Sequence, residues 1–326
     1  MLGWLLLALA PGCARAEADL SQIRLPPGFV IELFARIPNA RSMAVAPELG
    51  VVFVGNRRGN SVWAAVYADG DGRAEKVQRI ARGLRVPNGI AWRDGYLYVA
   101  EQHRIIRYAV PSRKSLPLTK PEILLEGLPD KRHHGWRYLA FDGRGRLHVT
   151  LGAPCNICLP DGLEGTIIRL VPGGPPRIVA RGVRNSVGMD FHPVSGRLYF
   201  TDNGADFMGD DLPPDELNMV PSPGAPKEGL HFGYPYYGGG GARTGDFKVQ
   251  TPPPGVIFPV QEFGAHVAAL GVHFYRGRMF PPYYRGRAFI AQHGSWNRSV
   301  PDGYRVMSLG LDAAGQGRDK KPFAQG

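Results

Sequence analysis

The chain has 326 residues, including 44 glycines and 30 prolines, and 44% of its residues are hydrophobic and 10% aromatic. This apolar content is too high for a disordered chain, the glycines lack the three-residue period of collagen, and no heptad pattern is sustained as in a coiled coil. Short apolar runs such as residues 51–54 and 96–99 favour one large all-β domain of strands joined by turns. The net charge of +11 fits an ordinary basic secreted protein or one with a small anionic ligand. Nucleic acid binding is not expected, because the arginines are spread through separate turns.

Residues 1–16 have the pattern of a secretory signal peptide. The apolar stretch 4–10 is too short to span a bilayer, and Ala14, Arg15 and Ala16 form the small-x-small pattern of a cleavage site. A lipoprotein site at Cys13 fits less well, because the residues before it depart from the usual motif. We therefore expect a periplasmic or secreted protein without a transmembrane segment, whose domain comprises residues 17–326.

Five copies of a repeated unit organise the chain. Each copy has a short apolar strand, a glycine turn, a second apolar strand, a polar loop and a third strand. The copies span residues 43–63, 89–106, 138–168, 187–219 and 270–306. The first four begin about 46 to 49 residues apart, which is typical of β-propeller blades. Residues 221–265, which are rich in proline, glycine and tyrosine, are expected to form a long loop across one face.

Polar residues directly before two of these units are candidates for chemistry. His134 precedes the third unit, where a histidine could act as a base near neutral pH or simply cap a turn. Arg184 and Asn185 precede the fourth unit at the equivalent place. They could face the same cavity as His134, or they could form a salt bridge or a turn cap.

Two further features lie in the predicted loops. Six carboxylates fall between residues 202 and 216, which suits a Ca²⁺ site or, alternatively, solvated loop charge paired with arginines. Cys155 and Cys158 are separated by two residues in a loop. A structural disulfide or a pair of free thiols is expected there, because the βαβ setting of a thioredoxin-like motif is absent.

Several motifs, taken in chain order, resemble those of the soluble pyrroloquinoline-quinone (PQQ) sugar dehydrogenases, and of the sorbosone dehydrogenase branch in particular. The resemblance extends from about Leu25 to Leu311. It implies a six-bladed β-propeller that binds PQQ and Ca²⁺ and oxidises an aldose or a related sugar. The motifs are His134-x-x-Arg137, Gly152-x-x-Cys155-Asn156-x-Cys158, Arg184-Asn185, Asp215-Glu216-Leu217-Asn218, Phe232-Gly233-Tyr234-Pro235 and His293-Gly294-Ser295-Trp296-Asn297-Arg298.

The resemblance implies catalytic roles for two residues and a cofactor contact for a third. His134 matches the general base, which removes a proton from the substrate hydroxyl as hydride passes to the quinone. Arg184 and Asn185 match the pair beside the reactive quinone carbonyl. An arginine at that place would stabilise the oxyanion that develops as the hydride arrives.

The resemblance also implies ligands for the metal and for a cofactor carboxylate. Glu216 and the carbonyl oxygen of Phe232 match the calcium ligands, although residues 231–235 differ from the usual sequence and the spacing from Glu216 is longer. Arg298 matches a basic residue that holds a carboxylate of PQQ.

The chain departs from the family at its end. A sixth blade should follow the fifth unit, yet only residues 312–326 come after Leu311. We therefore expect a six-bladed propeller whose sixth blade is missing or truncated, in a C-terminally incomplete domain, with residues 28–34 as the strand that would join the last blade. Two other functions stay open: a metal-dependent lactonase that works without a quinone, and a non-catalytic propeller that binds carbohydrate or protein. The motifs do not name the sugar or the electron acceptor.

Overall fold

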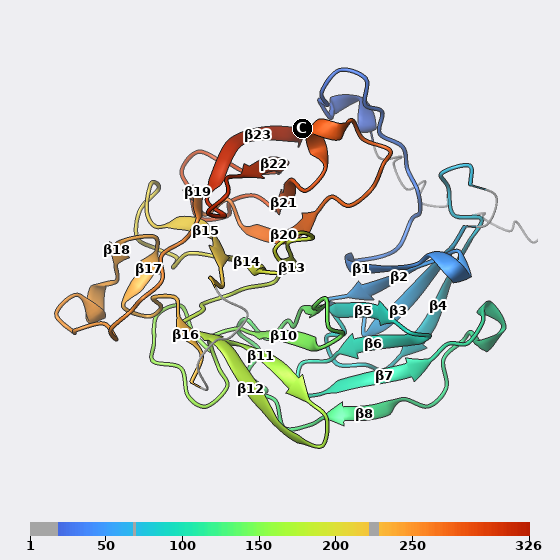
Figure 1. Ribbon diagram of the computed structural model, residues 1–326, viewed down its shortest axis with the longest axis horizontal. Helices are drawn as coiled ribbons and strands as arrows, with labels where there is room; N and C mark the ends of the chain where they lie inside the picture. Colours follow the sequence, from blue (N-terminus) through green and yellow to red (C-terminus); the bar gives the residue numbers. More distant parts are fainter. Residues whose placement is uncertain (1–18, 68–69, 222–227) are drawn as a thin grey trace, which may run out of the picture.

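The computed structural model describes residues 19–67, 70–221 and 228–326, and it shows an all-β protein (Figure 1). No α-helix occurs in these residues, and none of their helical turns is long and apolar enough to cross a membrane. The predicted signal peptide, residues 1–16, lies outside the described residues. The helical turns are the 3₁₀ segments η1 (Leu20–Gln22), η2 (Pro47–Leu49), η3 (Arg113–Ser115), η4 (Gly245–Phe247) and η5 (Pro282–Tyr284).

Five sheets are arranged as propeller blades, each with four antiparallel strands in chain order. Blades 1 and 2 follow each other directly in the sequence. Blade 1 contains β1 (Ala40–Ala46), β2 (Val51–Asn56), β3 (Ser61–Val66) and β4 (Lys76–Arg82). Blade 2 contains β5 (Gly89–Arg93), β6 (Tyr96–Ala100), β7 (Ile105–Ala109) and β8 (Glu122–Leu125).

The remaining three blades complete the described part of the propeller. Blade 3 contains β9 (Leu139–Phe141), β10 (Leu147–Leu151), β11 (Thr166–Val171) and β12 (Gly174–Arg181). Blade 4 contains β13 (Met189–Phe191), β14 (Leu198–Asp202), β15 (Pro214–Met219) and β19 (Gln261–Ala265). Blade 5 contains β20 (Ala269–Phe274), β21 (Ala288–Gln292), β22 (Arg305–Leu311) and β23 (Gly317–Gln325). The five repeated units predicted from the sequence are confirmed as the first three strands of these blades.

The segment between β15 and β19 is more ordered than the single long loop expected from its composition. β16 (Leu230–His231) pairs in parallel with β12, so this segment of chain adds a fifth strand to blade 3. β17 (Tyr237–Gly239) and β18 (Ala242–Arg243) form a separate hairpin. β19, within the expected loop, pairs with β15 as the outer strand of blade 4. The expectation of one loop was wrong because polar, proline-rich sequence conceals short strands that pair only with distant partners.

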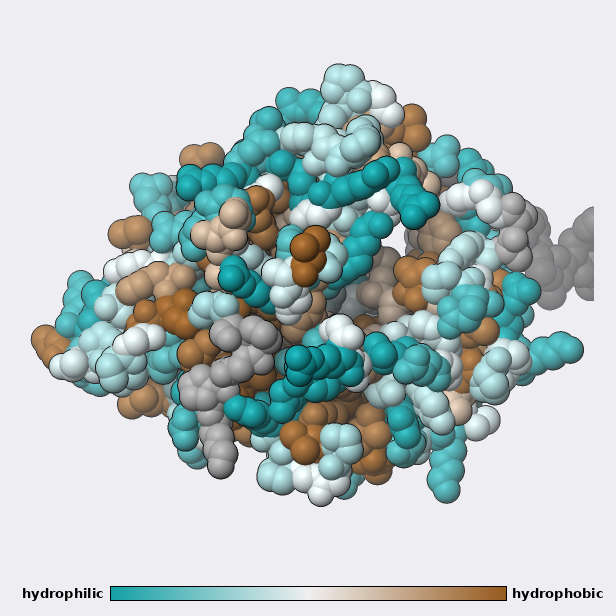
Figure 2. Space-filling model, viewed as in Figure 1, coloured by the Kyte–Doolittle hydropathy of each residue, from teal (hydrophilic) through white to brown (hydrophobic). Residues whose placement is uncertain are grey.

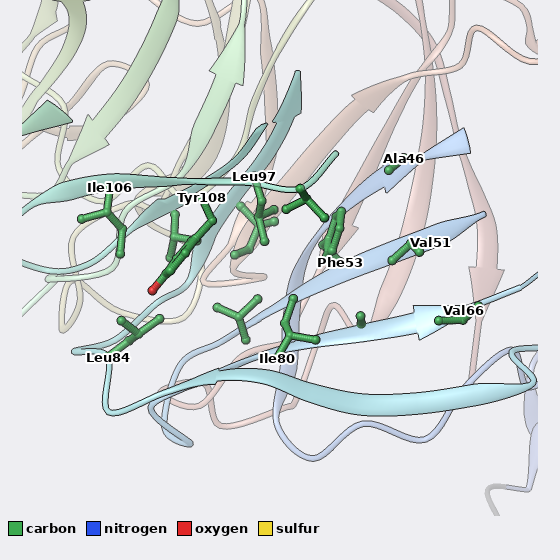
Figure 3. Packing of buried hydrophobic residues seen from close by; sticks show 14 residues of the cluster. Ala46, Val51, Phe53, Val66, Ile80, Leu84, Leu97, Ile106 and Tyr108 are labelled. Carbon is green, nitrogen blue, oxygen red and sulfur yellow. The ribbon is translucent and has the colours of Figure 1, made fainter. Parts of the chain in front are cut away.

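Apolar side chains fill the space between neighbouring blades. Figure 3 shows the cluster between blades 1 and 2, where Val51, Phe53 and Ile80 meet Leu97 and Ile106. All five side chains are buried. At about 25 cal/mol per Å² of apolar surface removed from water, such interfaces supply most of the energy that holds one blade on the next.

The inner strands do not close a ring within the described residues. β1 packs against β5, β5 against β9, β9 against β13, and β13 against β20, but β20 and β1 form no comparable contact. The space-filling view is hollowed where blade 5 faces blade 1 (Figure 2). On β1, Met43 is 64% exposed and Val45 is 52% exposed. The structure thus has five blades in its described part, whereas the sequence led us to expect a six-bladed plan with its last blade missing or truncated.

Two segments near the chain ends differ from expectation. Residues 28–34 form no strand; the preceding segment makes a single bridge, between Arg24 and Gln325. Phe29 instead packs edge-on against Phe280 and Phe323 of the blade 5 region, with ring centroids 4.8 and 4.9 Å apart. Residues 312–326, which had no assigned unit, supply β23, the outer strand of blade 5.

Candidate functional site

A cavity of about 1040 Å³ opens where blades 1, 3, 4 and 5 converge. In an antiparallel blade the first strand begins and the second strand ends at the same rim, so the residues beside these strand ends share one face. The cavity lining includes residues at the start of β1, before β9 and β13, and after β2, β14 and β21. Five arginines and four histidines line it together with two aspartates. Cationic side chains therefore outnumber acidic ones in the lining of this cavity.

His134 lies in this cavity, as the sequence predicts, and only 9% of it is exposed. It has a left-handed backbone with φ of 47°, and its ring contacts that of His133 with centroids 4.0 Å apart. Gly152 permits this placement, because a Cβ atom there would lie 2.5 Å from the Cβ of His134. The backbone conformation and the neighbouring glycine together fix the ring at the cavity wall.

The hydrogen bonding of His134 leaves one ring nitrogen free to accept a proton. Nδ1 lies 2.9 Å from the carbonyl oxygen of Ala153, to which it donates, so Nε2 carries the lone pair. Burial lowers the pKa of His134 to about 2, and the positive charges of Arg184 and His133 act in the same direction. The imidazole is therefore neutral across the physiological range, as a general base must be before the reaction.

Arg184 is 3% exposed and is held by residues from several loops. Nε donates to the carbonyl oxygen of Asn156 at 2.9 Å and Nη1 to that of Asn203 at 3.1 Å. Nη2 donates to Oδ1 of Asn156 at 2.7 Å and pairs with Oδ2 of Asp206 at 2.8 Å. Because a guanidinium has five N–H groups, these four bonds leave one on Nη1 for a ligand.

Asn156 contacts Arg184 through two oxygen atoms, a contact that the sequence did not reveal. Its neighbours Cys155 and Cys158 form a disulfide, one of the two states expected from their spacing. The backbone N–H of Cys158 donates to the hydroxyl of Tyr234 at 3.0 Å, which fixes the loop on a distant segment. The Cys-x-x-Cys spacing was the only signal that this loop is constrained. Only the fold shows that this loop positions the side chain of Arg184.

A second, small cavity adjoins Arg184 and is bordered by Asp202, Glu216 and Phe232. At about 10 Å³ it has the size needed for one water molecule or one ion. Asp202 and Glu216 face each other on paired strands β14 and β15. The carboxylate of Asp202 accepts the backbone N–H groups of Arg184 at 2.8 Å and Asn185 at 2.6 Å. The two proposed calcium ligands, Glu216 and Phe232, are therefore brought together despite the longer spacing between them.

The two buried carboxylates at this small cavity repel each other. Burial raises the pKa of Glu216 to about 8, and the charge of Asp202 adds to the effect. Burial likewise raises the pKa of Asp202 to about 7, against the opposing effect of its backbone hydrogen bonds. A cation at this point would remove the repulsion and favour both ionised forms. Carboxylate and carbonyl oxygens are ligands that suit Ca²⁺, so the residues fit that ion.

The described residues do not supply a complete metal site from acidic, histidine and cysteine side chains. Across residues 19–67, 70–221 and 228–326, no group of three or more such side chains is arranged to hold a metal ion. A Ca²⁺ ion bound near Glu216 would need carbonyl oxygens, water or a bound cofactor to complete its usual six to eight ligands.

Asn185 and Arg298 differ in how they relate to the large cavity. Asn185 lines it, and its buried Oδ1 has no hydrogen-bond partner in the described part of the chain. An unpaired buried acceptor beside a cationic cavity fits an anionic ligand that also carries a donor group. Arg298 does not line the cavity; its Nε donates to the carbonyl oxygen of Val300 at 3.1 Å and its Nη1 to that of Asp210.

Blade 1 contributes cationic residues that were not picked out in the sequence. Arg41 and Arg57 both line the cavity. Their Cζ atoms lie 5.4 and 3.2 Å from the ring centroid of Trp136, two residues beyond His134. No local pattern signals this cluster, because its members come from separate blades.

The fold and the cavity define a β-propeller with an anion-attracting site, and solved structures of similar fold include enzymes that bind PQQ. The PQQ domain of the Coprinopsis cinerea pyranose dehydrogenase superposes with a TM-score of 0.74 at 16% identity, covering 93% of this chain and 86% of that one. PQQ-bound aldose sugar dehydrogenase from Streptomyces coelicolor has a TM-score of 0.66 at 18% identity, with coverage of 92% and 84%. A carbohydrate-active enzyme of family AA12 from Trichoderma reesei reaches 0.82 at 18% identity, with coverage of 96% and 90%.

Sequence comparison establishes the family. The model of the glucose/sorbosone dehydrogenase family matches residues 99–294. An uncharacterized protein of Borreliella burgdorferi is 34% identical over 325 residues, which cover 95% of this chain and 83% of the relative. The chain therefore belongs to the glucose/sorbosone dehydrogenase family, and the resemblance seen in its motifs is confirmed.

Proposed function

We propose that this protein is a periplasmic or secreted quinoprotein that uses PQQ and Ca²⁺ to oxidise an aldose or a related sugar. The observation that carries the proposal is the meeting of His134, Arg184 and Glu216 around two cavities that share Arg184. Membership of the glucose/sorbosone dehydrogenase family supports the same chemistry.

The residues present fit both groups. Arg184 and Asn185 would hold PQQ, through the free N–H of the guanidinium and the unpaired Oδ1 of the amide. Glu216 and the carbonyl oxygen of Phe232 would hold Ca²⁺. Arg298 keeps its assignment to a cofactor carboxylate from the resemblance alone, and it would have to exchange its present carbonyl partners for that role. When bound, PQQ accepts the hydride that leaves the sugar carbon.

His134 would accept the proton of the reacting sugar hydroxyl at Nε2. Loss of this proton, together with departure of the hydride, converts the hydroxyl-bearing carbon into a carbonyl. The bond from Nδ1 to Ala153 fixes the tautomer and the direction of the lone pair. Protonated His134 is disfavoured by burial and by Arg184, so negative charge that develops in the cavity would help it to hold the proton.

Arg184 would act without changing its protonation state. Its partners Asn156 and Asp206 orient the guanidinium before any ligand arrives. A preorganised donor stabilises an oxygen on which negative charge develops, because no reorganisation is needed during the reaction. Its single remaining N–H is the group that can do this.

The test is to add PQQ and Ca²⁺ to the purified protein and to record the quinone absorption and dye reduction with a panel of aldoses. We expect a bound-quinone spectrum that is reduced by at least one sugar, with dye turnover that depends on both additions. Absence of quinone binding would overturn the proposal. Hydrolysis of a lactone without PQQ, in a parallel assay, would favour the metal-dependent lactonase instead.

A further inference from the structure

The blade 1 wall of the large cavity carries two arginines that the proposed chemistry does not use. Arg41 lies at the start of β1 and Arg57 follows the end of β2, so both stand at the rim of blade 1. Each is partly buried, and both guanidiniums approach the ring of Trp136. A guanidinium on an aromatic face is held in place while its N–H edges stay available for a planar anion.

These arginines differ from Arg184 in having no acidic partner. Arg184 pairs with Asp206, whereas no carboxylate of the described residues forms an ion pair with Arg41 or Arg57. Burial lowers the pKa of Arg57 to about 10, and the charges of Arg41 and then Arg58 add to the effect. Burial also lowers the pKa of Arg41, with a further contribution from Arg58. The wall is thus a concentration of positive charge that a bound anion would relieve.

The blade 1 wall lies closer in the chain to the proposed base, which would contact the substrate, than to the residues proposed to hold the quinone. Trp136 is in the same short segment as the proposed base, His134, whose reacting hydroxyl belongs to the sugar. Arg184 and Asn185, the proposed quinone contacts, lie before blade 4. The cavity volume of about 1040 Å³ is at the upper end for one drug-sized ligand, so it has room for a cofactor and a sugar together.

We propose that Arg41 and Arg57, oriented by Trp136, form a carboxylate-binding subsite that selects an acidic sugar, such as a uronic acid, over its neutral counterpart. This inference rests on the proposed oxidation of a sugar in the same cavity. A bidentate contact from an arginine fork to a carboxylate supplies the discrimination, since a neutral sugar leaves the same N–H groups unpaired.

The test compares D-glucuronate with D-glucose in two assays. Calorimetry measures the Kd of each sugar with the Ca²⁺-supplemented protein in the absence of PQQ, where no turnover occurs. Dye reduction measures kcat/KM for each sugar with PQQ added. We expect the wild type to prefer glucuronate in both assays and Arg57→Gln to reduce that preference by about 10- to 100-fold, the range for hydrogen bonds to charged groups. Added salt should weaken glucuronate binding but not glucose binding.

Matched variants separate the subsite from general effects. Arg107→Gln is the control, because Arg107 also lies over an aromatic ring, Tyr96, at 4.3 Å, but does not line the cavity. It should leave both preferences unchanged. Arg57→Lys keeps the charge and should retain part of the preference while losing the fork geometry. Arg41→Gln repeats the test if Arg57→Gln does not fold.

The outcomes distinguish this inference from the proposed function. If no sugar is oxidised by any variant, the calorimetric preference and its dependence on Arg57 still test the subsite. Equal binding of the two sugars, or a preference that survives Arg57→Gln and Arg41→Gln, would overturn it. If Arg57→Gln weakens PQQ binding but leaves the preference for glucuronate unchanged, Arg57 contacts the cofactor. That result would also overturn the proposed carboxylate subsite.

Discussion

At the scale of single residues, the proposed chemistry depends on which nitrogen of His134 is free. The carbonyl of Ala153 accepts a hydrogen bond from Nδ1, which leaves Nε2 as the nitrogen that can accept a proton. His134→Ala should therefore reduce turnover by about 10²- to 10⁴-fold, the usual contribution of a general base, while PQQ binding stays largely intact. Steady-state dye reduction and a PQQ titration measure the two effects. His192→Ala, at a histidine that does not line the cavity, is the control. Unchanged turnover in His134→Ala would shift the role to His133.

Asn156 is proposed to act indirectly: its side-chain and backbone oxygens accept hydrogen bonds from Arg184 and so position the guanidinium. In Asn156→Ala the guanidinium loses one of its fixed partners, and we expect kcat to fall by about 10- to 100-fold with little change in KM. Asn156→Asp, which keeps the acceptor, should restore part of kcat. A merely structural role would instead lower the melting temperature and leave kcat of the folded fraction unchanged.

The disulfide beside Asn156 belongs to the same loop, and we expect it to shape that loop without taking part in the chemistry. The Cys155→Ser, Cys158→Ser double variant should keep its dehydrogenase activity, because hydrogen bonds to Tyr234 and Arg184 still hold the loop. This expectation follows from a shaping role without electron transfer. Complete loss of activity in a correctly folded double variant would show that the cysteines take part in the reaction.

At the scale of elements, Asp190 joins blades 4 and 5. From β13 it accepts the backbone N–H of Phe274 in β20 at 2.7 Å and forms an ion pair with Arg276 at 2.8 Å. Burial alone would raise the pKa of Asp190, but hydrogen bonds with His273, Arg276 and Phe274 lower it to about 2. Asp190 therefore stabilises the interface between blades 4 and 5, whose described strands do not pair with each other.

The lowered pKa of Asp190 gives a pH dependence of stability with a definite sign. The pKa is below the ordinary value of 3.8, so the stabilisation is fully present above pH 3.8 and is lost as the pH falls toward 2. Asp190→Asn should lower the free energy of unfolding by about 2 kcal/mol near neutral pH and flatten its decline in acid. Thermal unfolding between pH 2 and 7 measures this. Asp94→Asn, at a side chain that is 78% exposed, should change little.

At the scale of the whole molecule, the cavity collects residues from blades 1, 3, 4 and 5, so a ligand bound there would tie the blades together. We expect PQQ with Ca²⁺ to raise the melting temperature. At a ligand concentration 100 times its Kd, binding adds about 2.7 kcal/mol to the free energy of unfolding. A chelator should reverse the shift and Glu216→Gln should abolish it, because Glu216 would hold the Ca²⁺ that PQQ binding is proposed to require. If neither change affects PQQ binding, that binding does not depend on Ca²⁺ at Glu216.

The repeating architecture could be predicted from the amino-acid sequence alone, and so could several residues that the structure places at the two cavities. Strand, glycine turn and strand are local patterns, so the units around residues 43, 89, 138, 187 and 270 could be found without a structure. His134 and Arg184 lie in the loops that precede β9 and β13, and the rim position of such loops in a propeller follows from the local strand order. Glu216 lies within β15, in the acidic segment that the sequence singled out. Family motifs then supplied roles that spacing alone could not.

Which distant residues meet could be seen only from the folded chain. Residues 28–34 have the composition of a strand but pair with no strand in the described part of the chain, and Phe29 packs against aromatic rings instead. Asn156 meets Arg184, and Arg57 meets Trp136, across sequence separations for which no local pattern exists. Contacts of this kind arise from the packing of whole blades, because each blade brings its own strand ends to a shared rim only after the sheets have assembled.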